Sequence, residues 1–461
     1  RYMRNNIYEQ ESLSKLIFAF GIPSILSLII EMLTGVVDTA FAGNLPGVGE
    51  SALSSMALIS PMLGIFTALQ TLFAMSTGIL IARYMNNEEQ QNRSYVAGVI
   101  MTVVVAVVTS LLCYITLPQI LSALGASGEI LDLAKDYMQI QLISNIFSSI
   151  GYTLTCCIRA FGYPKIEVII ITSAVFINII FNYIFAFTFH MDMAGLALGT
   201  FVSEFVCASL SVIFLIKKKL WLKKVSVSIS WFTKSVFELF KIGISQTVIQ
   251  ILGGCTGFII NGRLLSLGTM THVAAWSVVQ RLYSLILMPI VGLTQGVQNI
   301  ISYFGGNHQQ EKTKKVSKLT MMYCSSYGIF SLVVVILCGD SLLSIFGGAQ
   351  EMMKVAETVL LVVFAGFPFI GILYTDMTLL QVTGHEVASV MLILSRQIFF
   401  LIPLIYLVPY LVGLSQLPIL PVMALFLCMP IADLLATIFS LFMKKRLSKQ
   451  ESIVELPESS L

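Results

Sequence analysis

The chain has 461 residues, of which 57% are hydrophobic and only 11% are charged, and its mean hydropathy is +0.89. A soluble domain carries about 25% charged residues, so this composition excludes an ordinary soluble protein and indicates a membrane protein. The net charge of +3 is small and is explained by membrane insertion, so it gives no reason to expect a nucleic-acid partner.

Apolar windows of about 20 residues, the length that a helix needs to cross the hydrocarbon core, recur about twelve times. Helices are favoured over a membrane barrel because unpaired backbone groups are costly in lipid and period-two alternation is absent. The predicted spans are residues 16–42, 52–82, 95–117, 134–158, 166–189, 193–216, 237–263, 272–303, 316–339, 355–382, 387–411 and 417–443. The predicted fold class is an all-α polytopic membrane protein with twelve transmembrane helices.

Lysine and arginine residues concentrate in alternate connections between these spans. One set of connections carries only Lys135, Arg263 and Lys354, whereas the other set, which includes both termini, carries most of the remainder. Because positively charged connections stay on the cytoplasmic side, both termini are predicted to be cytoplasmic. The basic stretch 216–240 either rests on anionic lipid headgroups or is a plain cytoplasmic loop.

Several segments recur at a step of 222 residues. "FGIPSILSLIIEMLTG" (20–35) returns as "IGISQTVIQILGGCTG" (242–257), and "LGASGEILDLA" (124–134) returns as "FGGAQEMMKVA" (346–356). We therefore predict a duplication into two pseudo-symmetric six-helix bundles, a plan typical of transporters. The predicted domains are an N-lobe at 1–215, a cytoplasmic basic linker at 216–236, a C-lobe at 237–443 and a cytoplasmic tail at 444–461.

Five acidic residues lie in the interior of predicted spans, more than three residues from either end. Each costs about 2.5–3.5 kcal/mol at the bilayer centre, so function is the default explanation for them. They are Glu31, Asp38, Glu204, Asp376 and Asp433. Glu31, Thr34 and Asp38 are spaced by three and four residues and share one helix face, as do Asn178 and Asn182. For each acid the alternative is a purely structural hydrogen bond or a side chain that reaches the membrane surface.

Two arginines, Arg281 and Arg396, also fall in the interior of predicted spans. A buried cation requires a partner. Asp376 is one candidate partner for Arg396, and the alternative is that the arginines extend to the membrane surface. The eight cysteines are expected to be small buried hydrophobes because they lie in apolar stretches without metal-ligand spacing, and the four dispersed histidines predict no metal site either.

Six stretches carry a resemblance to a known family. They are "GIPSILSLIIEMLTGVVDTAFAGNLPG" (21–47), "CIRAFGYP" (157–164), "NIIFNYIFAF" (178–187), "AGLALGT" (194–200), "FKIGISQTVIQ" (240–250) and "LLQVTGH" (379–385). In their order the chain resembles the multidrug and toxic compound extrusion (MATE) family. The resemblance implies a carrier of the cell membrane that exports cationic, amphipathic drugs by alternating access in exchange for protons or sodium ions. It is expected to act as a monomer without ATP or another cofactor.

The resemblance also implies roles for individual residues. Asp38 matches an acidic position late in the family's first helix, and the implied ion-coupling set is Asp38, Asn178, Asn182, Tyr137 and Thr200. Many members carry Asp where this chain has Asn182, which puts a two-carboxylate relay in doubt. The implied substrate-cavity set is Glu31, Thr34, Gln250, Gln295 and Asp376. In the second half Ile260 stands where Asp38 stands in the first, so the acid site is expected to be asymmetric.

Other functions predict different sequence features. A flippase for lipid-linked oligosaccharide, from the same broad fold group, predicts more basic residues in the cavity and additional helices. A membrane-embedded enzyme needs a nucleophile with a base or a metal cluster, and the sequence contains neither HExxH nor GxSxG. The protein is therefore expected not to be an enzyme.

Overall fold

The structure is a computed structural model that describes residues 7–10, 12–223, 228–344, 350–414 and 420–454. Parts of five predicted features lie outside these residues: 1–6 of the N-lobe with its basic residues Arg1 and Arg4, 224–227 of the linker, 346–349 of the repeat segment at 346–356, 417–419 of the last predicted span, and 455–461 of the tail.

The described chain is helical, as its hydropathy predicted. The elements in chain order are α1 (Ile7–Gln10), α2 (Leu13–Gly43), α3 (Gly49–Arg83), α4 (Glu88–Ala123), α5 (Gly128–Ala160), α6 (Pro164–Tyr183), η1 (Ile184–Thr188), α7 (Asp192–Lys217), α8 (Ile229–Leu267), α9 (Met270–Gly306), α10 (Gln310–Ser344), α11 (Gln350–Phe364), α12 (Phe367–Val382), α13 (Glu386–Leu394), η2 (Ser395–Leu401), α14 (Ile402–Leu414) and α15 (Pro421–Val454). The short elements η1 and η2 are π-helical.

Each predicted span coincides with a helix or with a run of joined helices. Within the described ranges, ten helices are long and apolar enough to cross a membrane, and the bent pair α11 and α12 makes an eleventh. The predicted span at 134–158 falls in α5, which is long enough to cross a membrane but less apolar than the ten helices above. Since α5 packs against α3, α4, α6 and α7, its polar side chains are satisfied by other helices; Asn145, for example, donates to Ser110 Oγ at 3.0 Å.

Some predicted boundaries differ from the observed ones. The span predicted at 355–382 is broken into α11 and α12, bent by 47°, because Pro368 in the first turn of α12 supplies no backbone N–H and disfavours a helical residue before it. The first part of the predicted tail is helical, since α15 continues to Val454. The prediction for the cysteines was wrong at Cys255 and Cys338, which are exposed while the other six are buried.

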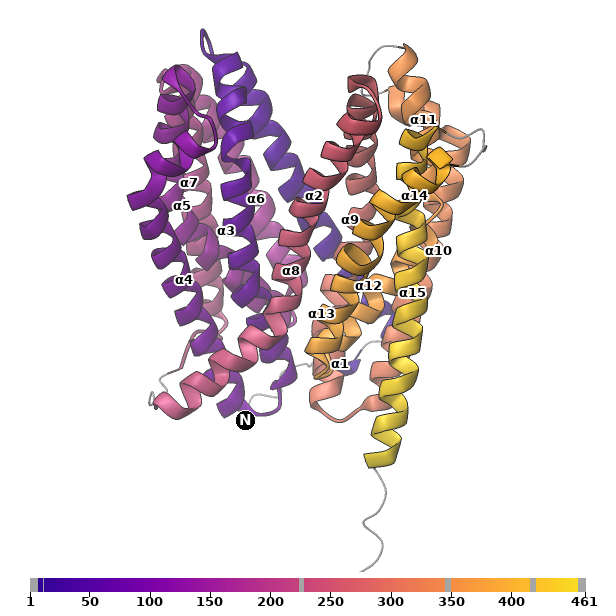
Figure 1. The fold of residues 1–461 in the computed structure, drawn as a ribbon. Helices are drawn as coiled ribbons and strands as arrows, with labels where there is room; N and C mark the ends of the chain where they lie inside the picture. The colour runs from indigo at the N-terminus through magenta and orange to yellow at the C-terminus, as the bar shows by residue number, and fades with distance from the viewer. Residues whose placement is uncertain (1–6, 11, 224–227, 345–349, 415–419, 455–461) are drawn as a thin grey trace, which may run out of the picture. The chain divides into compact units, whose positions relative to one another are not determined.

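The chain forms two compact units. Unit 1 comprises residues 1–251 and 295–316, and unit 2 comprises residues 252–294 and 317–461. In unit 1, α5 packs between α3 and α7, which run beside it (Figure 1), and α2 packs against α6. In unit 2, α15 contacts α11, α12 and α14. The predicted division into lobes at 215 and 237 describes the sequence repeat and stays a prediction.

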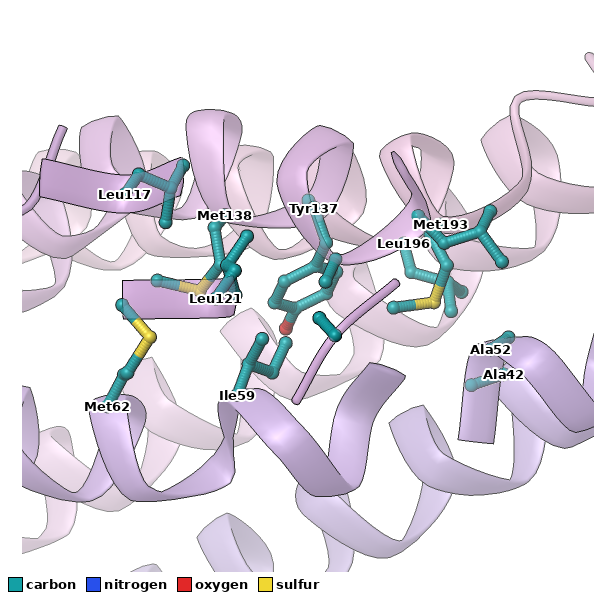
Figure 2. Packing of buried hydrophobic residues seen from close by; sticks show 14 of the residues in the cluster. Ala42, Ala52, Ile59, Met62, Leu117, Leu121, Tyr137, Met138, Met193 and Leu196 are labelled. Carbon is teal, nitrogen blue, oxygen red and sulfur yellow. The ribbon is translucent and has the colours of Figure 1, made fainter. Parts of the chain in front are cut away.

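A buried hydrophobic cluster fills the end of unit 1 at which α2 finishes and α3 begins (Figure 2). It joins the C-terminal ends of α2 and α4 to the N-terminal parts of α3, α5 and α7, and includes Ala42, Ile59, Leu121, Met138 and Leu196. Large apolar side chains on other faces, such as Leu111 and Ile115 of α4, are exposed, as expected of helices that face lipid. The cluster holds the helix ends together one turn from Asp38 on α2.

Candidate ion-coupling site

Four polar side chains from three helices form one hydrogen-bonded chain in unit 1. Asn182 of α6 donates from Nδ2 to Asp38 Oδ1 of α2 at 2.6 Å and to Asn178 Oδ1 at 3.1 Å. Asn178 in turn donates from Nδ2 to Thr200 Oγ1 of α7 at 3.3 Å, and Thr200 donates to the backbone oxygen of Leu196 at 3.1 Å. The helical spacing of the two asparagines, predicted from the sequence, points both of them into this chain.

The amides are buried while the acid keeps access to its surroundings. Asn178 is 2% and Asn182 0% exposed, whereas Asp38 and Thr200 are partly exposed. Asn182 Oδ1 has no hydrogen-bond partner within the part of the chain that the structure describes. A buried amide oxygen without a donor is costly. This atom can therefore accept a hydrogen bond or contact a cation.

Two glycines on α7 make the site possible by letting α6 and η1 approach closely. A Cβ at Gly199 would overlap the side chain of Asn182 and lie 2.6 Å from its backbone nitrogen, and a Cβ at Gly195 would lie 2.6 Å from the backbone nitrogen of Ala186. Both distances are far below van der Waals contact. The stretch "AGLALGT" therefore supplies the geometry as well as the hydroxyl of Thr200.

Tyr137 borders the site from α5. Its ring is 4% exposed and belongs to the hydrophobic cluster, where Figure 2 shows it between Met138 and the side chains of α7. It lies close enough to Asp38 for their charges to interact. We conclude that Tyr137 forms part of the apolar border of the site with one polar atom near the carboxylate.

The residues predicted for the substrate cavity have different surroundings. Glu31 and Gln250 are exposed, whereas Thr34 and Gln295 are partly exposed. Thr34 donates to the backbone oxygen of Ile30 at 3.0 Å. These four residues lie in unit 1, and their accessible side chains leave the substrate assignment open as a prediction.

Asp376 differs from the others because it is 0% exposed and fully engaged. Lys444 of α15 pairs with its Oδ1 at 2.6 Å, and Ser440 donates to its Oδ2 at 2.5 Å. Both of its oxygens therefore already have a donor.

The partner suggested for Arg396 was wrong. Arg396, on η2, pairs through Nε with Asp433 Oδ1 of α15 at 2.6 Å, not with Asp376. The packing of the helices decides which acid lies next to each basic residue. The spacing of residues in the sequence does not reveal these pairs. Arg281, also expected to be buried, is exposed.

A buried ion pair in unit 1 was missed altogether. Arg159 follows the predicted span 134–158 directly, but it lies in the last turn of α5 and is 5% exposed. It pairs from Nη1 with Glu167 Oε1 of α6 at 3.2 Å and donates to Ser24 Oγ of α2 at 3.1 Å. The signal that could have found this pair is an arginine and a glutamate flanking the short turn in "RAFGYPKIE", with apolar residues on either side.

The site can hold one positive charge. Its single carboxylate accepts a proton or a small cation, and the amide and hydroxyl oxygens beside it are ligands that suit a hard cation such as sodium. Because Asn182 donates to Asp38, the observed bonding fits the ionised acid, and protonation would weaken that bond. The arrangement is therefore a two-state site, with one form carrying a negative charge that requires compensation.

Comparisons with known proteins agree with this fold. The sequence profile of the family described as MatE matches residues 23–184 and again residues 247–407, close to the spacing of the predicted repeat. The multidrug export protein MepA of Staphylococcus haemolyticus is 29% identical over 418 residues, covering 88% of this chain and 90% of the relative. MepA of Staphylococcus aureus strain N315 is 28% identical over 422 residues, with the same coverage.

Solved structures share the fold. A multidrug resistance MATE family transporter in an outward-facing conformation superposes with a TM-score of 0.88 at 17% identity, covering 98% of this chain and 100% of that one. The Vibrio cholerae MATE transporter VcmN in its bent form gives 0.87 at 18% identity, covering 96% of this chain and 98% of that one. Since the family profile accounts for more than half of the sequence, the chain belongs to the MATE family of multi-pass membrane transporters and is not an enzyme.

Proposed function

We propose that the protein exports cationic, amphipathic drugs in exchange for protons or sodium ions, and that Asp38 carries the coupling charge. The observation that supports this most directly is the partly exposed carboxylate of Asp38, held by Asn182 in a cluster of amides and a hydroxyl. Relatives that cover 88% of the chain are named multidrug export proteins, which supports the class of substrate.

The proposed cycle follows from the two forms of Asp38. In the outward-facing state the acid takes a proton or sodium ion and the drug leaves, and in the inward-facing state the ion departs and a cationic drug binds. The drug and the ion are exchanged because an unpaired charge in the membrane is energetically costly in either state. The membrane potential contributes about 2.3 kcal/mol per charge per 100 mV. Pro23, inside α2, permits this helix to bend when the bonding of Asp38 changes.

The remaining predictions join this proposal. The protein acts as a monomer in the cell membrane with both termini in the cytoplasm, and its two lobes follow the sequence repeat. Glu31, Thr34, Gln250 and Gln295 line the path of the drug. Asp376 was predicted for the same path; because it is fully buried and paired with Lys444, it can contribute only if that pair opens.

The experiment uses the purified full chain in proteoliposomes loaded with ethidium as the fluorescent cation. Efflux is measured under an imposed proton gradient and, separately, an imposed sodium gradient. We compare the wild type with Asp38→Asn and with the control Glu50→Gln, an exposed acid at the start of α3. We expect one gradient to drive efflux in the wild type and the control, and Asp38→Asn to lose at least about nine-tenths of the driven rate. Unchanged efflux in Asp38→Asn would refute its coupling role, and efflux driven only by ATP would refute antiport.

A further inference from the structure

A continuous polar stripe follows one face of α2. Its members, spaced alternately by three and four residues, are Ser24, Ser27, Glu31, Thr34 and Asp38. This spacing keeps side chains on the same side of a helix, and at 1.5 Å per residue the stripe is about 21 Å long. A stripe of this length reaches across most of the hydrocarbon core.

The two ends of the stripe contact two polar clusters of unit 1, the ion-coupling site and the Arg159–Glu167 pair. At one end, Asp38 accepts the hydrogen bond from Asn182 at 2.6 Å. At the other end, Ser24 accepts a hydrogen bond from Arg159 at 3.1 Å, and Arg159 pairs with Glu167. The stripe therefore connects the ion-coupling site to a buried ion pair near the start of α2.

Carboxylates occupy the middle of this connection. Glu31 is exposed and lies within electrostatic range of Glu204 on α7 and of Glu167. Glu204 is partly exposed, lies near Ser148 of α5 and interacts electrostatically with Asp38. The groups that act on Glu31 or are acted on by it from the packed helices are Tyr152, Cys156 and Arg159 of α5, Glu167 of α6, and Glu204 and Cys207 of α7.

Buried polar atoms along the same route lack partners. Ser27 Oγ, Glu167 Oε2 and Asn182 Oδ1 accept or donate no hydrogen bond within the described ranges, although their residues are 4%, 3% and 0% exposed. Native proteins seldom leave such atoms unsatisfied, and each one calls for an explanation. Ser27 lies near the beginning of the stripe, Glu167 pairs with Arg159 at that end, and Asn182 bonds to Asp38 at the other end. These atoms can form transient hydrogen bonds along the route of a proton.

We propose that Glu31 and Glu204 carry the coupling proton between Asp38 and the Arg159–Glu167 end of α2. The proposal rests on the proposed antiport function and commits the coupling ion to H⁺. Asp38 and Glu31 are seven residues apart, about 10 Å along the helix, which is beyond one hydrogen bond or one bridging water. Glu204 supplies the intermediate carboxylate from α7. In each step one carboxylic acid loses its proton and the next carboxylate gains it, so that charge and protons balance.

The test measures proton-driven exchange and drug binding separately on the full chain in proteoliposomes. The variants are Glu31→Gln and Glu204→Gln, which keep size and hydrogen bonding but cannot exchange a proton. The matched control is Glu50→Gln, and Glu31→Asp tests rescue because it retains a carboxylic acid. Ethidium binding is followed by fluorescence, folding by gel filtration and thermal unfolding, and the rate in H₂O is compared with that in D₂O.

We expect Glu204→Gln to bind ethidium within about threefold of the wild type. In both glutamine variants the rate driven by the proton gradient should fall about tenfold or more, as for loss of a proton-transfer group. The solvent isotope effect should rise in both, Glu31→Asp should recover part of the rate, and Glu50→Gln should match the wild type.

Three results would overturn the proposal. Unchanged proton-driven rates would remove both glutamates from the route. A loss of ethidium affinity with an unchanged isotope effect would make Glu31 a drug contact. Efflux driven by sodium and not by protons in the wild type would refute the proton route while leaving antiport by Asp38 intact.

Discussion

Gly199 offers a sharp test of how the ion-coupling site is built. In Gly199→Ala the new Cβ would lie 2.6 Å from the backbone nitrogen of Asn182 and 2.9 Å from its Cα. Carbon atoms in contact prefer about 3.5–4.0 Å, so α6 and α7 must separate by about 1 Å. Overpacking of this kind costs about 1–3 kcal/mol, against about 0.5–1 kcal/mol gained from the higher helix propensity of alanine. The net expectation is a loss of about 1–2 kcal/mol of stability.

The same displacement should affect function more than stability. Moving α6 by about 1 Å from α7 would break the 3.3 Å hydrogen bond from Asn178 to Thr200, which joins the two helices, since a donor–acceptor distance of about 3.6 Å or more is no longer a hydrogen bond. We expect Gly199→Ala to lose most gradient-driven efflux while still inserting into membranes. The control is Gly64→Ala on α3, where a Cβ meets no atom within 4 Å, and which should be as stable as the wild type or more so. If thermal unfolding and efflux of Gly199→Ala equal those of Gly64→Ala, close helix packing does not position Asn182.

Three further predictions concern stability. Lys444→Met leaves the fully buried Asp376 without its cation, so thermal unfolding should show a loss of about 3 kcal/mol, and adding Asp376→Asn should restore most of it; additive losses would contradict the pairing. Burial and a carboxylate on α8 raise the pKa of Tyr84 to about 12, so its contribution to stability is complete below the unfolded pKa of about 10 and is lost as the pH rises towards 12. The free energy of unfolding of the wild type should fall over that pH range more than that of Tyr84→Phe. Parallel curves of stability against pH would contradict this effect. Tyr8 is 2% exposed and donates to the backbone oxygen of Ala160 at 2.8 Å. Tyr8→Phe should therefore lower the free energy of unfolding by about 1 kcal/mol. An unchanged midpoint in a denaturant titration would contradict this prediction.

The sequence by itself determined the class of the protein, because hydropathy and helical periodicity are local properties of the chain. Apolar windows located the spans to within a few residues, and the repeat anticipated the two matches to the family profile at 23–184 and 247–407. Helical spacing also put Asn178 and Asn182 on one face, which the structure confirms through their shared hydrogen bond. The span predicted at 134–158 from its apolar residues coincides with α5, although that helix also carries polar side chains.

Only the tertiary structure decided which charged groups neutralise one another. Arg396 and Asp433 are 37 residues apart, and Lys444 and Asp376 are 68 apart, so nothing in the local sequence selects these pairs over the alternative of Arg396 with Asp376. The same is true of Arg159, whose burial depends on how α2, α5 and α6 pack. Hydropathy indicates that a charge within a span needs a partner, but the partner is chosen by the helix faces that meet. For that reason only the tertiary structure distinguishes Asp38 from the acids that pair with a cation. The one described side-chain donor to Asp38 is an amide.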